Sequence, residues 1–424
     1  MASKILAEEG RVEEMWWKQA NDLIPGGTLT TSKHPSRLMS NYPKFIKSGE
    51  KCFLEDLDGK VYTDYISGLG AIILGYADRF VNRRVVEQIS LGNLYSMGDT
   101  RTISLAKSLT YHIPSAEMVK LFKNGTDATS AAVRVARAYT GKEKILVCGY
   151  HGWADWYAVC QKGKAGIPRS LEALVGKFQY NDIESLRKHF TSDDIAAVIM
   201  EPVQFEEPKN DFLKQVKQVC QEHGALLIFD EIITGYRMGL SGAQGLLGVV
   251  PDLTTVSKAM GNGYPISALV GRKEYMEVWL RDDFFVSGTF NGDLVGVAAA
   301  LEVTHQLETN DKAKLRAIWK SGQTFKDGAN LITQNLKVDV RCEGYAPRTG
   351  LVFPTIEHKS LYYQEMCKEG YLMGPNNFIQ YSHTPIIIQA TLNAFERVMC
   401  KIKENWDFPQ AALEGPTANE VVLR

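Results

Sequence analysis

Three segments in the middle of the chain contain continuous apolar runs that end in a glycine or an acidic residue. They are KILVCGYHG (144–152), AAVIMEPV (196–203) and ALLIFDEI (225–232). Apolar side chains on both faces of a strand are typical of a parallel sheet that helices cover on each side. We therefore predict that these segments are buried strands of such a sheet.

Helical patterns lie between these predicted strands, over residues 127–141, 181–190 and 212–224. The first ends at Gly141 and the third at Gly224, and glycine is a common residue just past a helix C-terminus. Alternating strands and helices predict an α/β, doubly wound domain.

In a doubly wound sheet, ligands bind beyond the carboxyl ends of the strands. Tyr150, His151, Glu201 and Asp230 would lie there, because each follows or ends one of the three apolar runs. These four residues are the first candidates for a functional site.

The flanking regions predict a second, smaller domain. Residues 8–23 have a helical pattern, and two strand-like runs follow, joined by an Asp58-Gly59 turn. After about residue 295 the pattern changes to a long helix and then to mixed strands and helices. We predict an N-terminal segment (1–60) that is part of the small domain, a large domain (61–295) and a C-terminal small domain (296–424), with residues 412–424 as a loose tail.

Composition narrows the functional class only modestly. The chain has 424 residues, 45% hydrophobic and 23% charged, with a net charge of −1. This balance gives no sign of a nucleic-acid partner. The longest apolar runs are far short of the roughly 20 residues that a membrane span needs, and the charged N-terminus predicts no secretory leader.

Seven scattered cysteines, none in a C-x-x-C pair, predict reduced thiols in a cytoplasmic protein. Their spacing matches no metal site, and we expect none.

Lys258 is a candidate nucleophile. It lies in DLTTVSKAMGNGYPISALVG (252–271), among small, apolar and hydroxyl residues, and no acidic residue occurs between Asp252 and Glu274. Desolvation favours the neutral amine of a lysine, and a neutral amine can form a Schiff base with a carbonyl. The alternative is a surface lysine beside a glycine-rich loop, and this stretch alone does not choose between the two.

Asp230 places a carboxylate at the end of the apolar run LLIF. A buried acid needs a partner, and the protonated ring nitrogen of pyridoxal phosphate (PLP) is one. The alternative, a magnesium-binding acid of an ATPase, requires a G-x-x-x-x-G-K-[ST] loop, which this chain lacks. GNGYPI lacks the third glycine of a dinucleotide fingerprint, and no G-x-S-x-G elbow occurs.

FKNGTDATSAAVRVAR (122–137) could bind a phosphate. Gly125 permits a close backbone approach, Thr126 supplies a hydroxyl, and a helix begins just after them. SGTFNG (287–292) is a second Gly-Thr element, and Tyr150 could stack on a flat ring. Each of these features also has a purely structural interpretation. Residues 122–137 could be an ordinary capped helix, residues 287–292 a turn, and Tyr150 a packed aromatic residue.

Taken in order, these segments resemble the class III PLP-dependent aminotransferases, and most of all the glutamate-1-semialdehyde 2,1-aminomutase branch. The resemblance rests on NGTDATSAAVRVAR, GYHGWADW, MEPV, LLIFDEIITGYR, PDLTTVSKAMGNGYPISALVG and SGTFNG, together with the N-terminal IPGGTLTTSKHPSR (24–37). It implies a fold-type I, aspartate aminotransferase-like transferase, with a mainly parallel sheet in a large domain and a smaller α+β domain.

The resemblance also implies roles for individual residues. Lys258 would form the Schiff base with PLP, Asp230 would hold the ring nitrogen, and Tyr150 would stack on the ring. Gly125 and Thr126 would bind the phosphate. Thr289 would reach the phosphate in a neighbouring subunit, which implies a homodimer with active sites at the subunit interface. Glu201 matches the glutamate that precedes a proline in the family's motif.

Several positions depart from the aminomutase pattern. Thr30 and Lys33 stand where that branch has a serine and an arginine for the substrate carboxylate. Lysine lacks the planar fork with which arginine grips a carboxylate. Glu206 replaces an asparagine beside the cofactor, and Ile379 replaces a glutamate. Thr30, Lys33 and Glu206, together with His151, remain the candidate substrate contacts.

These departures favour an aminotransferase over a mutase. The expected reaction moves an amino group from a donor, with glutamate as the first choice, to a carbonyl acceptor, while the cofactor alternates between PLP and pyridoxamine phosphate. A looser resemblance of the T-L-T-x-S-K-x-P and YHGWxDW variants to proteins of surface-polysaccharide pathways suggests a keto-sugar acceptor. An aminomutase is the alternative, and a non-catalytic homologue is a third reading that the retained Lys258, Asp230 and Thr126 disfavour.

Overall fold

The computed structural model describes residues 2–34, 37, 39–191 and 193–418. The chain forms two compact units. Among the described residues, the small unit comprises residues 2–69, 73–78 and 316–418, and the large unit comprises residues 70–72 and 79–315. The domain boundaries expected from the sequence, after residues 60 and 295, stay a prediction. The helix α11 (Leu294–Leu336) begins in the large unit and continues in the small unit.

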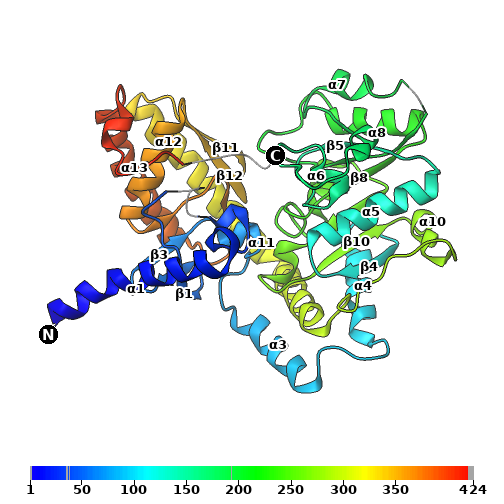
Figure 1. Cartoon of the computed structure of the whole chain (residues 1–424), viewed down its shortest axis with the longest axis horizontal. Coiled ribbons are helices and arrows are strands. Elements are labelled where there is room, and N and C mark those ends of the chain that lie inside the picture. Colours follow the sequence, from blue (N-terminus) through cyan, green and yellow to red (C-terminus); the bar gives the residue numbers. More distant parts are fainter. Residues whose placement is uncertain (1, 35–36, 38, 192, 419–424) are drawn as a thin grey trace. The chain divides into compact units, whose positions relative to one another are not determined.

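The large unit contains a seven-stranded sheet in the order β4-β10-β9-β8-β7-β5-β6. Figure 1 labels β4, β10, β8 and β5 of this sheet. Only β10 runs opposite to the other strands of the sheet, and the predicted parallel strands β5, β7 and β8 lie side by side. The strands are β4 (Met118–Phe122), β5 (Lys144–Cys148), β6 (Val175–Lys177), β7 (Ile195–Met200), β8 (Leu226–Asp230), β9 (Leu253–Val256) and β10 (Ser267–Gly271).

Helices cover both faces of this sheet, as the continuous apolar strands predicted. Ile199 and Ile228 pack on one face with the buried side of α5 (Gly125–Thr140), and Val198 and Phe229 pack on the other with α8 (Phe212–Glu222). The remaining helices of this unit are α3 (Arg79–Leu91), α4 (Thr100–His112), α6 (Asp155–Ala158), α7 (Ile183–Arg187), α9 (Gly242–Leu247) and α10 (Lys273–Met276).

The small unit has two smaller sheets, ordered β1-β2-β3-β13 and β11-β12-β14. The predicted turn at Asp58-Gly59 joins β2 to β3, and Gly59 has a φ of +80°. The elements of this unit are α1 (Ala2–Leu23), β1 (Ile46–Glu50), β2 (Phe53–Asp56), β3 (Val61–Asp64), β11 (Arg341–Tyr345), β12 (Arg348–Val352), α12 (Ile356–Lys368), β13 (Tyr371–Leu372), β14 (Asn377–Phe378) and α13 (Pro385–Glu404).

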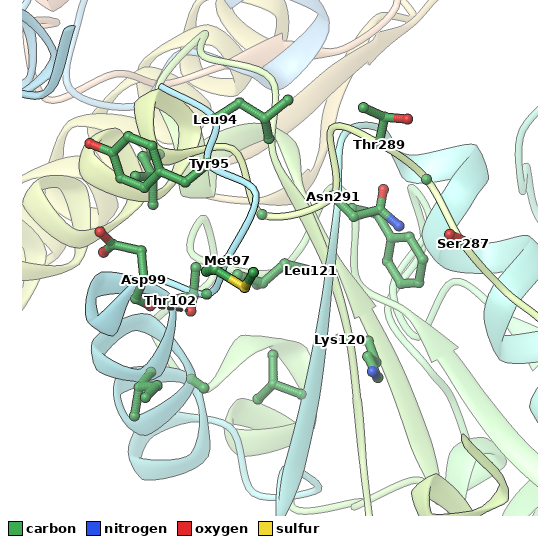
Figure 2. Close-up of a pocket in the computed structure, with 18 of the residues that line it drawn as sticks. Leu94, Tyr95, Met97, Asp99, Thr102, Lys120, Leu121, Ser287, Thr289 and Asn291 are labelled. Carbon is green, nitrogen blue, oxygen red and sulfur yellow. Dashed lines mark hydrogen bonds between the residues drawn. The ribbon is translucent and has the colours of Figure 1, made fainter. Parts of the chain in front are cut away.

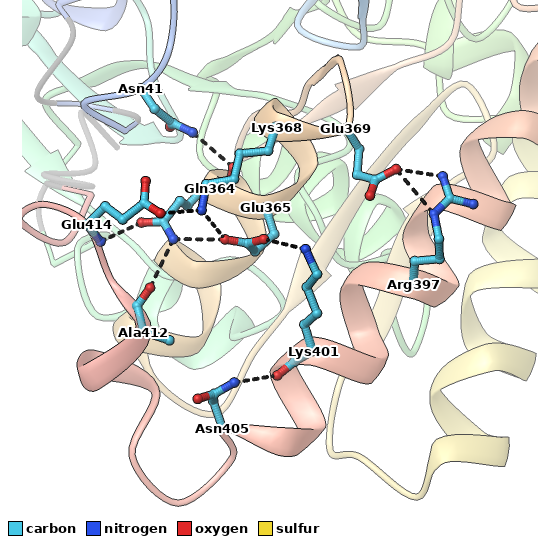
Figure 3. Close-up of polar contacts among 10 residues, drawn as sticks. All are labelled: Asn41, Gln364, Glu365, Lys368, Glu369, Arg397, Lys401, Asn405, Ala412 and Glu414. Atoms are coloured by element: carbon cyan, nitrogen blue, oxygen red, sulfur yellow. Dashed lines mark hydrogen bonds and ion pairs between the residues drawn. The ribbon is translucent and has the colours of Figure 1, made fainter.

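The C-terminal segment is not loose up to residue 418, which corrects the sequence-based expectation. Gln364 on α12 donates to the Ala412 carbonyl and accepts from the backbone N–H of Glu414 (Figure 3). Ala418 is buried, and its N–H donates to Ser360. The anchoring side chains lie about 50 positions earlier in the chain, so the local composition of the tail gave no sign of them. Residues 419–424 lie outside the described residues.

Glu365 is the charged centre of the same cluster. Its side chain is 8% exposed and accepts from Lys368 at 2.7 Å and from Lys401 at 3.0 Å. Burial alone would raise the pKa of this carboxyl, but the hydrogen bonds from Lys368, Gln364 and Lys401 outweigh burial and lower the pKa from 4.5 to about 2. The ionised form of Glu365 therefore stabilises the fold.

We predict that Glu365→Gln lowers the free energy of unfolding by about 2 kcal/mol at pH 7, because charge-assisted hydrogen bonds are lost. A depressed carboxyl pKa contributes stability above its unfolded value, and this contribution disappears as pH falls toward 2. The difference between the two proteins should therefore shrink between pH 5 and pH 3 in denaturant titrations. Glu343→Gln, at an exposed ion pair with Arg341, is the control, and equal losses in both variants would contradict the prediction.

Candidate active site

A pocket of about 430 Å³ lies in the large unit, at the carboxyl ends of its parallel strands. Most of the predicted site residues line it together: Gly125, Thr126, Tyr150, His151, Glu201, Asp230 and Lys258. They come from segments up to 133 positions apart in sequence, from Gly125 to Lys258. The structure therefore brings these residues together in one pocket, and the roles expected of them stay predictions.

Asp230 lines this pocket and is 3% exposed. Its Oδ2 lies 2.7 Å from Nδ1 of His151, a side chain that is itself buried. Its Oδ1 accepts from the backbone N–H of Ile232 at 3.1 Å and from Thr255 at 3.3 Å. These contacts supply the partners that a buried carboxylate needs and fix its orientation.

Glu201 organises the turn that carries Tyr150. Its Oε1 accepts from the backbone N–H of Tyr150 at 2.9 Å. Gly149 has a φ of +109°, and a Cβ there would lie 2.8 Å from the same Oε1. The glutamate thus fits closely against a backbone that only glycine adopts readily, and it positions the aromatic ring at the pocket wall.

The N-terminus of α5 opens into the pocket. Asn124 caps the helix in a reciprocal capping box with Asp127, and its carbonyl accepts from Ser267 of β10 at 2.6 Å. Gly125 and Thr126 form the first helical turn and line the pocket. Backbone N–H groups at the start of a 16-residue helix favour an anion such as a phosphate.

Lys258 lies on the turn that connects β9 to β10. Its φ is +46°, a left-handed conformation that is uncommon for a residue other than glycine. Ser257, just before it, donates from Oγ to the Ile266 carbonyl at 2.8 Å across the turn. Backbone strain of this kind occurs at functional sites when the surrounding structure enforces it.

Thr289 lies apart from this pocket. It lines a second cavity of about 580 Å³, which lies among the loop 93–99, α4, β4 and the loop 286–294 (Figure 2). Thr289 is exposed, and so is much of the apolar surface around it, including Met97 at 83% and Phe290 at 59%.

Three candidate substrate contacts are not among the residues of the large unit that line the Lys258 pocket. Glu206 is exposed and pairs with Lys209 at 2.8 Å. Thr30 and Lys33 belong to the small unit, where both are exposed. His151 does line the pocket, but its ring is buried and contacts Asp230. Ile379, also in the small unit, is fully buried.

Several pocket residues were not predicted. Trp153 is 75% exposed, and Ala71, Ile232 and Tyr264 complete part of the wall. Lys123 pairs with Asp293, and Tyr264 donates to Asn82 at 2.9 Å. The WADW motif could have directed attention to Trp153, whereas Ala71 carries no chemical signal in the sequence.

Comparison with known proteins identifies the family. The family model described as aminotransferase class-III matches residues 36–370. The chain belongs to the class III aminotransferases. It is 36% identical to a 3-aminobutyryl-CoA aminotransferase from Cloacimonas acidaminovorans (strain Evry), over 92% of this chain and 96% of that protein. It is 35% identical to a glutamate-1-semialdehyde 2,1-aminomutase from Sulfurisphaera tokodaii, over 92% of this chain and all of that protein.

Solved structures of class III transaminases share the fold. The PLP internal aldimine form of the FumI protein from Sphingopyxis sp. MTA144 superposes with a TM-score of 0.87 at 28% identity, over 93% of this chain and 97% of that chain. A glutamate-1-semialdehyde aminomutase from Pseudomonas aeruginosa PAO1 superposes with a TM-score of 0.81 at 18% identity, over 92% and 95% of the two chains. The predicted fold-type I architecture is thereby confirmed, and PLP is the cofactor of this class III enzyme.

The residues of the Lys258 pocket fit PLP chemically. The pocket combines an amine, a helix N-terminus, an aromatic ring and a buried carboxylate, which match an aldehyde, a phosphate, a flat ring and a ring nitrogen. In the part of the chain that the structure describes, no group of side chains is arranged to hold a metal ion. None of the described helices is long and apolar enough to cross a membrane.

We predict that Gly152→Ala weakens PLP binding at least tenfold. Gly152 has a φ of +105°, and an added Cβ would overlap Oγ1 of Thr126 at the start of α5. The overlap must displace either the 150–152 turn or the helix terminus, and both line the pocket. Equilibrium titration with PLP would measure the loss. Gly163→Ala, where a Cβ meets nothing within 4 Å, is the control, and matching affinities for the two variants would contradict the prediction.

Proposed function

We propose that this protein is a PLP-dependent aminotransferase that uses glutamate as amino donor and a keto-sugar as acceptor. The observation that carries the proposal is the convergence of Lys258, the Asp230–His151 pair and the α5 N-terminus on one pocket. We further propose that the enzyme works in the cytoplasm, where its seven unpaired cysteines would stay reduced.

PLP, when bound, supplies an aldehyde that condenses with amines and a ring that accepts the electron pair of a deprotonated carbon. The Asp230 carboxylate, held by His151, Ile232 and Thr255, would keep a proton on the ring nitrogen. Nζ of Lys258 would take a proton from the α-carbon of the donor. It would give a proton to the carbonyl carbon of the acceptor when that carbon receives the amino group. Tyr150 would stack against the ring, and the first turn of α5 would bind the phosphate.

The positions that depart from the aminomutase pattern support transfer between two molecules. Ile379 is fully buried and apolar, so it offers no carboxylate where the aminomutase branch has glutamate. Lys33 offers a point charge where that branch has an arginine fork. The keto-sugar acceptor rests on the YHGWADW variant, whose Trp153 gives the pocket an exposed aromatic surface.

An aminomutase is the second candidate, because one of the relatives reported above carries that name at nearly the same identity as the aminotransferase. The two functions differ in one testable respect. A mutase turns over a single substrate without an amino donor, whereas an aminotransferase stops after one half-reaction.

Absorbance titration with L-glutamate tests the proposal directly. We predict that the visible band of the lysine-linked cofactor disappears, that the pyridoxamine band grows, and that one equivalent of 2-oxoglutarate is released. Lys258→Ala should bind PLP without the lysine-linked band and lose at least 10³-fold in rate, because both the link and the proton transfer are lost. Lys273→Ala, at an exposed i,i+4 pair, is the control.

Two results would contradict the aminotransferase. Full activity of Lys258→Ala would remove the assigned nucleophile. Sustained turnover of an amino-aldehyde such as glutamate-1-semialdehyde, with no donor added and no response to glutamate, would establish the mutase instead.

We also propose that the protein is a homodimer in which Thr289 of one subunit reaches the phosphate site of the other. Thr289 is exposed at the rim of the second cavity and does not line its own subunit's Lys258 pocket (Figure 2). Exposed apolar side chains gather around it on one unit of the chain: Leu94, Tyr95, Met97, Ile103, Phe285 and Phe290. A surface of this kind is typical of a protein–protein interface.

We predict that Met97→Asp produces monomers and reduces activity at least tenfold, because a carboxylate would be buried in an apolar interface. Light scattering after size exclusion would measure the mass against the 47.3 kDa chain. Ile386→Asp, at an equally exposed position on α13, should remain dimeric. A wild-type monomer with full activity would contradict the dimer.

A further inference from the structure

Arg237 is a fully buried arginine outside the lining of the Lys258 pocket. It is the largest of the fully buried side chains in the described part of the chain. Its Nη2 donates to the Gly70 carbonyl at 3.0 Å and to the Ile72 carbonyl at 2.8 Å. These two carbonyls flank Ala71, which lines the pocket. One guanidinium therefore holds both sides of a single pocket residue.

The loop that carries Arg237 is itself fixed from within. Buried Glu231 accepts from the hydroxyl of Thr234 and from the backbone N–H groups of Ala243 and Gln244, and so ties the two ends of the loop together. Tyr236, next to the arginine, has a φ of +63° and its hydroxyl bonds Thr304 at 2.9 Å. A bulky residue in this conformation is strained, so the surrounding contacts must enforce the direction in which the chain enters Arg237.

A second contact holds the same segment on its other side. Ile72 is buried, and its Cδ1 lies so near Gly263 that a Cβ there would be 2.9 Å away. Gly263 lines the pocket on the turn that follows Lys258. The segment Gly70–Ile72 is thus held between the Arg237 loop and the Lys258 turn.

We propose that Gly70–Ile72, which we call the 70–72 wall, limits the size of the substrate at the Lys258 pocket, and that Arg237 is the positioning residue that holds this wall. The kinetic part of this proposal rests on the aminotransferase function proposed above. Ala71 contributes only a methyl group, so the wall leaves room where a larger residue would fill the pocket.

Arginine suits this task better than lysine. A buried charge is costly and persists only where its donors are used. The planar guanidinium presents donors in a fixed geometry, whereas an ammonium on a flexible stem does not. Both bonds to the wall come from one nitrogen, Nη2, whose two N–H directions are fixed in the guanidinium plane. Lysine in place of Arg237 would keep the charge and most of the volume but lose these fixed directions, so the wall should become mobile while the fold survives.

Hydrogen exchange of the PLP-loaded full chain tests whether Arg237 holds the 70–72 wall in place, and it requires no enzymatic turnover. Arg237→Lys should speed exchange at least tenfold in peptides covering residues 66–76 and leave the strands β5 and β8 unchanged. Arg341→Lys, at an exposed cluster with Asp339 and Glu343, is the control. Unchanged exchange in the 66–76 peptides, or faster exchange throughout the large unit, would contradict a local role of Arg237 in holding the 70–72 wall.

Half-reaction kinetics with L-glutamate and L-alanine test whether the 70–72 wall limits the size of the substrate. Arg237→Lys should raise KM for glutamate about tenfold, while kcat and the cofactor band stay within about twofold, because a mobile wall fits the bound substrate less well but takes no part in proton transfer. Ala71→Val narrows the pocket without touching the arginine, and it should lower kcat/KM for glutamate relative to alanine about tenfold, a typical effect of one or two methyl groups.

The outcomes separate this proposal from the proposed function. If wild type reacts with neither amine, the aminotransferase assignment fails, and the exchange experiment still decides whether Arg237 braces the wall. If wild type reacts but Arg237→Lys only lowers the melting temperature, with KM and local exchange unchanged, Arg237 is merely structural. An unchanged glutamate-to-alanine preference in Ala71→Val would overturn the wall as a limit on substrate size.

Discussion

The burial of one carboxylate at the carboxyl end of a central strand is the constraint on which the large unit depends. Asp230 finds hydrogen-bond partners there because the turn after β5 brings His151, β9 brings Thr255 and its own turn brings the Ile232 N–H. Those partners require neighbouring strands to be in register. The contacts that build the sheet therefore also build the site, and a shift of one residue in β5 or β9 would remove a partner of Asp230.

Several turns at the pocket and beside it adopt left-handed backbone conformations. Lys258 and Tyr236 have left-handed φ values, and Gly149 and Gly152 have values that favour glycine. Buried acids hold these turns: Glu201 through a backbone N–H and Glu231 through several donors. Desolvation raises the pKa of Glu231, so this carboxylate depends on its donors more than an exposed one would. The pocket is thereby pre-organised by groups that need not contact substrate.

Sequence reasoning located β5, β7, β8 and the pocket residues at their ends, because continuous apolar runs and punctuating glycines are local signals. It missed the docking of residues 412–418, since Gln364 and Lys368 act across a long stretch of chain. It also missed Arg237, because an arginine in sequence reads as a surface residue and only the fold reveals its burial. The candidate contacts Thr30, Lys33 and Glu206 stay predictions.

The pairing of β4 with β10 has a consequence for how the protein acquires its cofactor. Phe122 pairs with Ser267, and the Ser267 hydroxyl donates to the backbone carbonyl of Asn124, the residue whose side chain caps α5. During synthesis the N-terminal half of this site emerges long before the strand that completes it. The cofactor would therefore bind only to chains that have nearly finished folding. By mass action, this binding would shift the folding equilibrium toward the folded state.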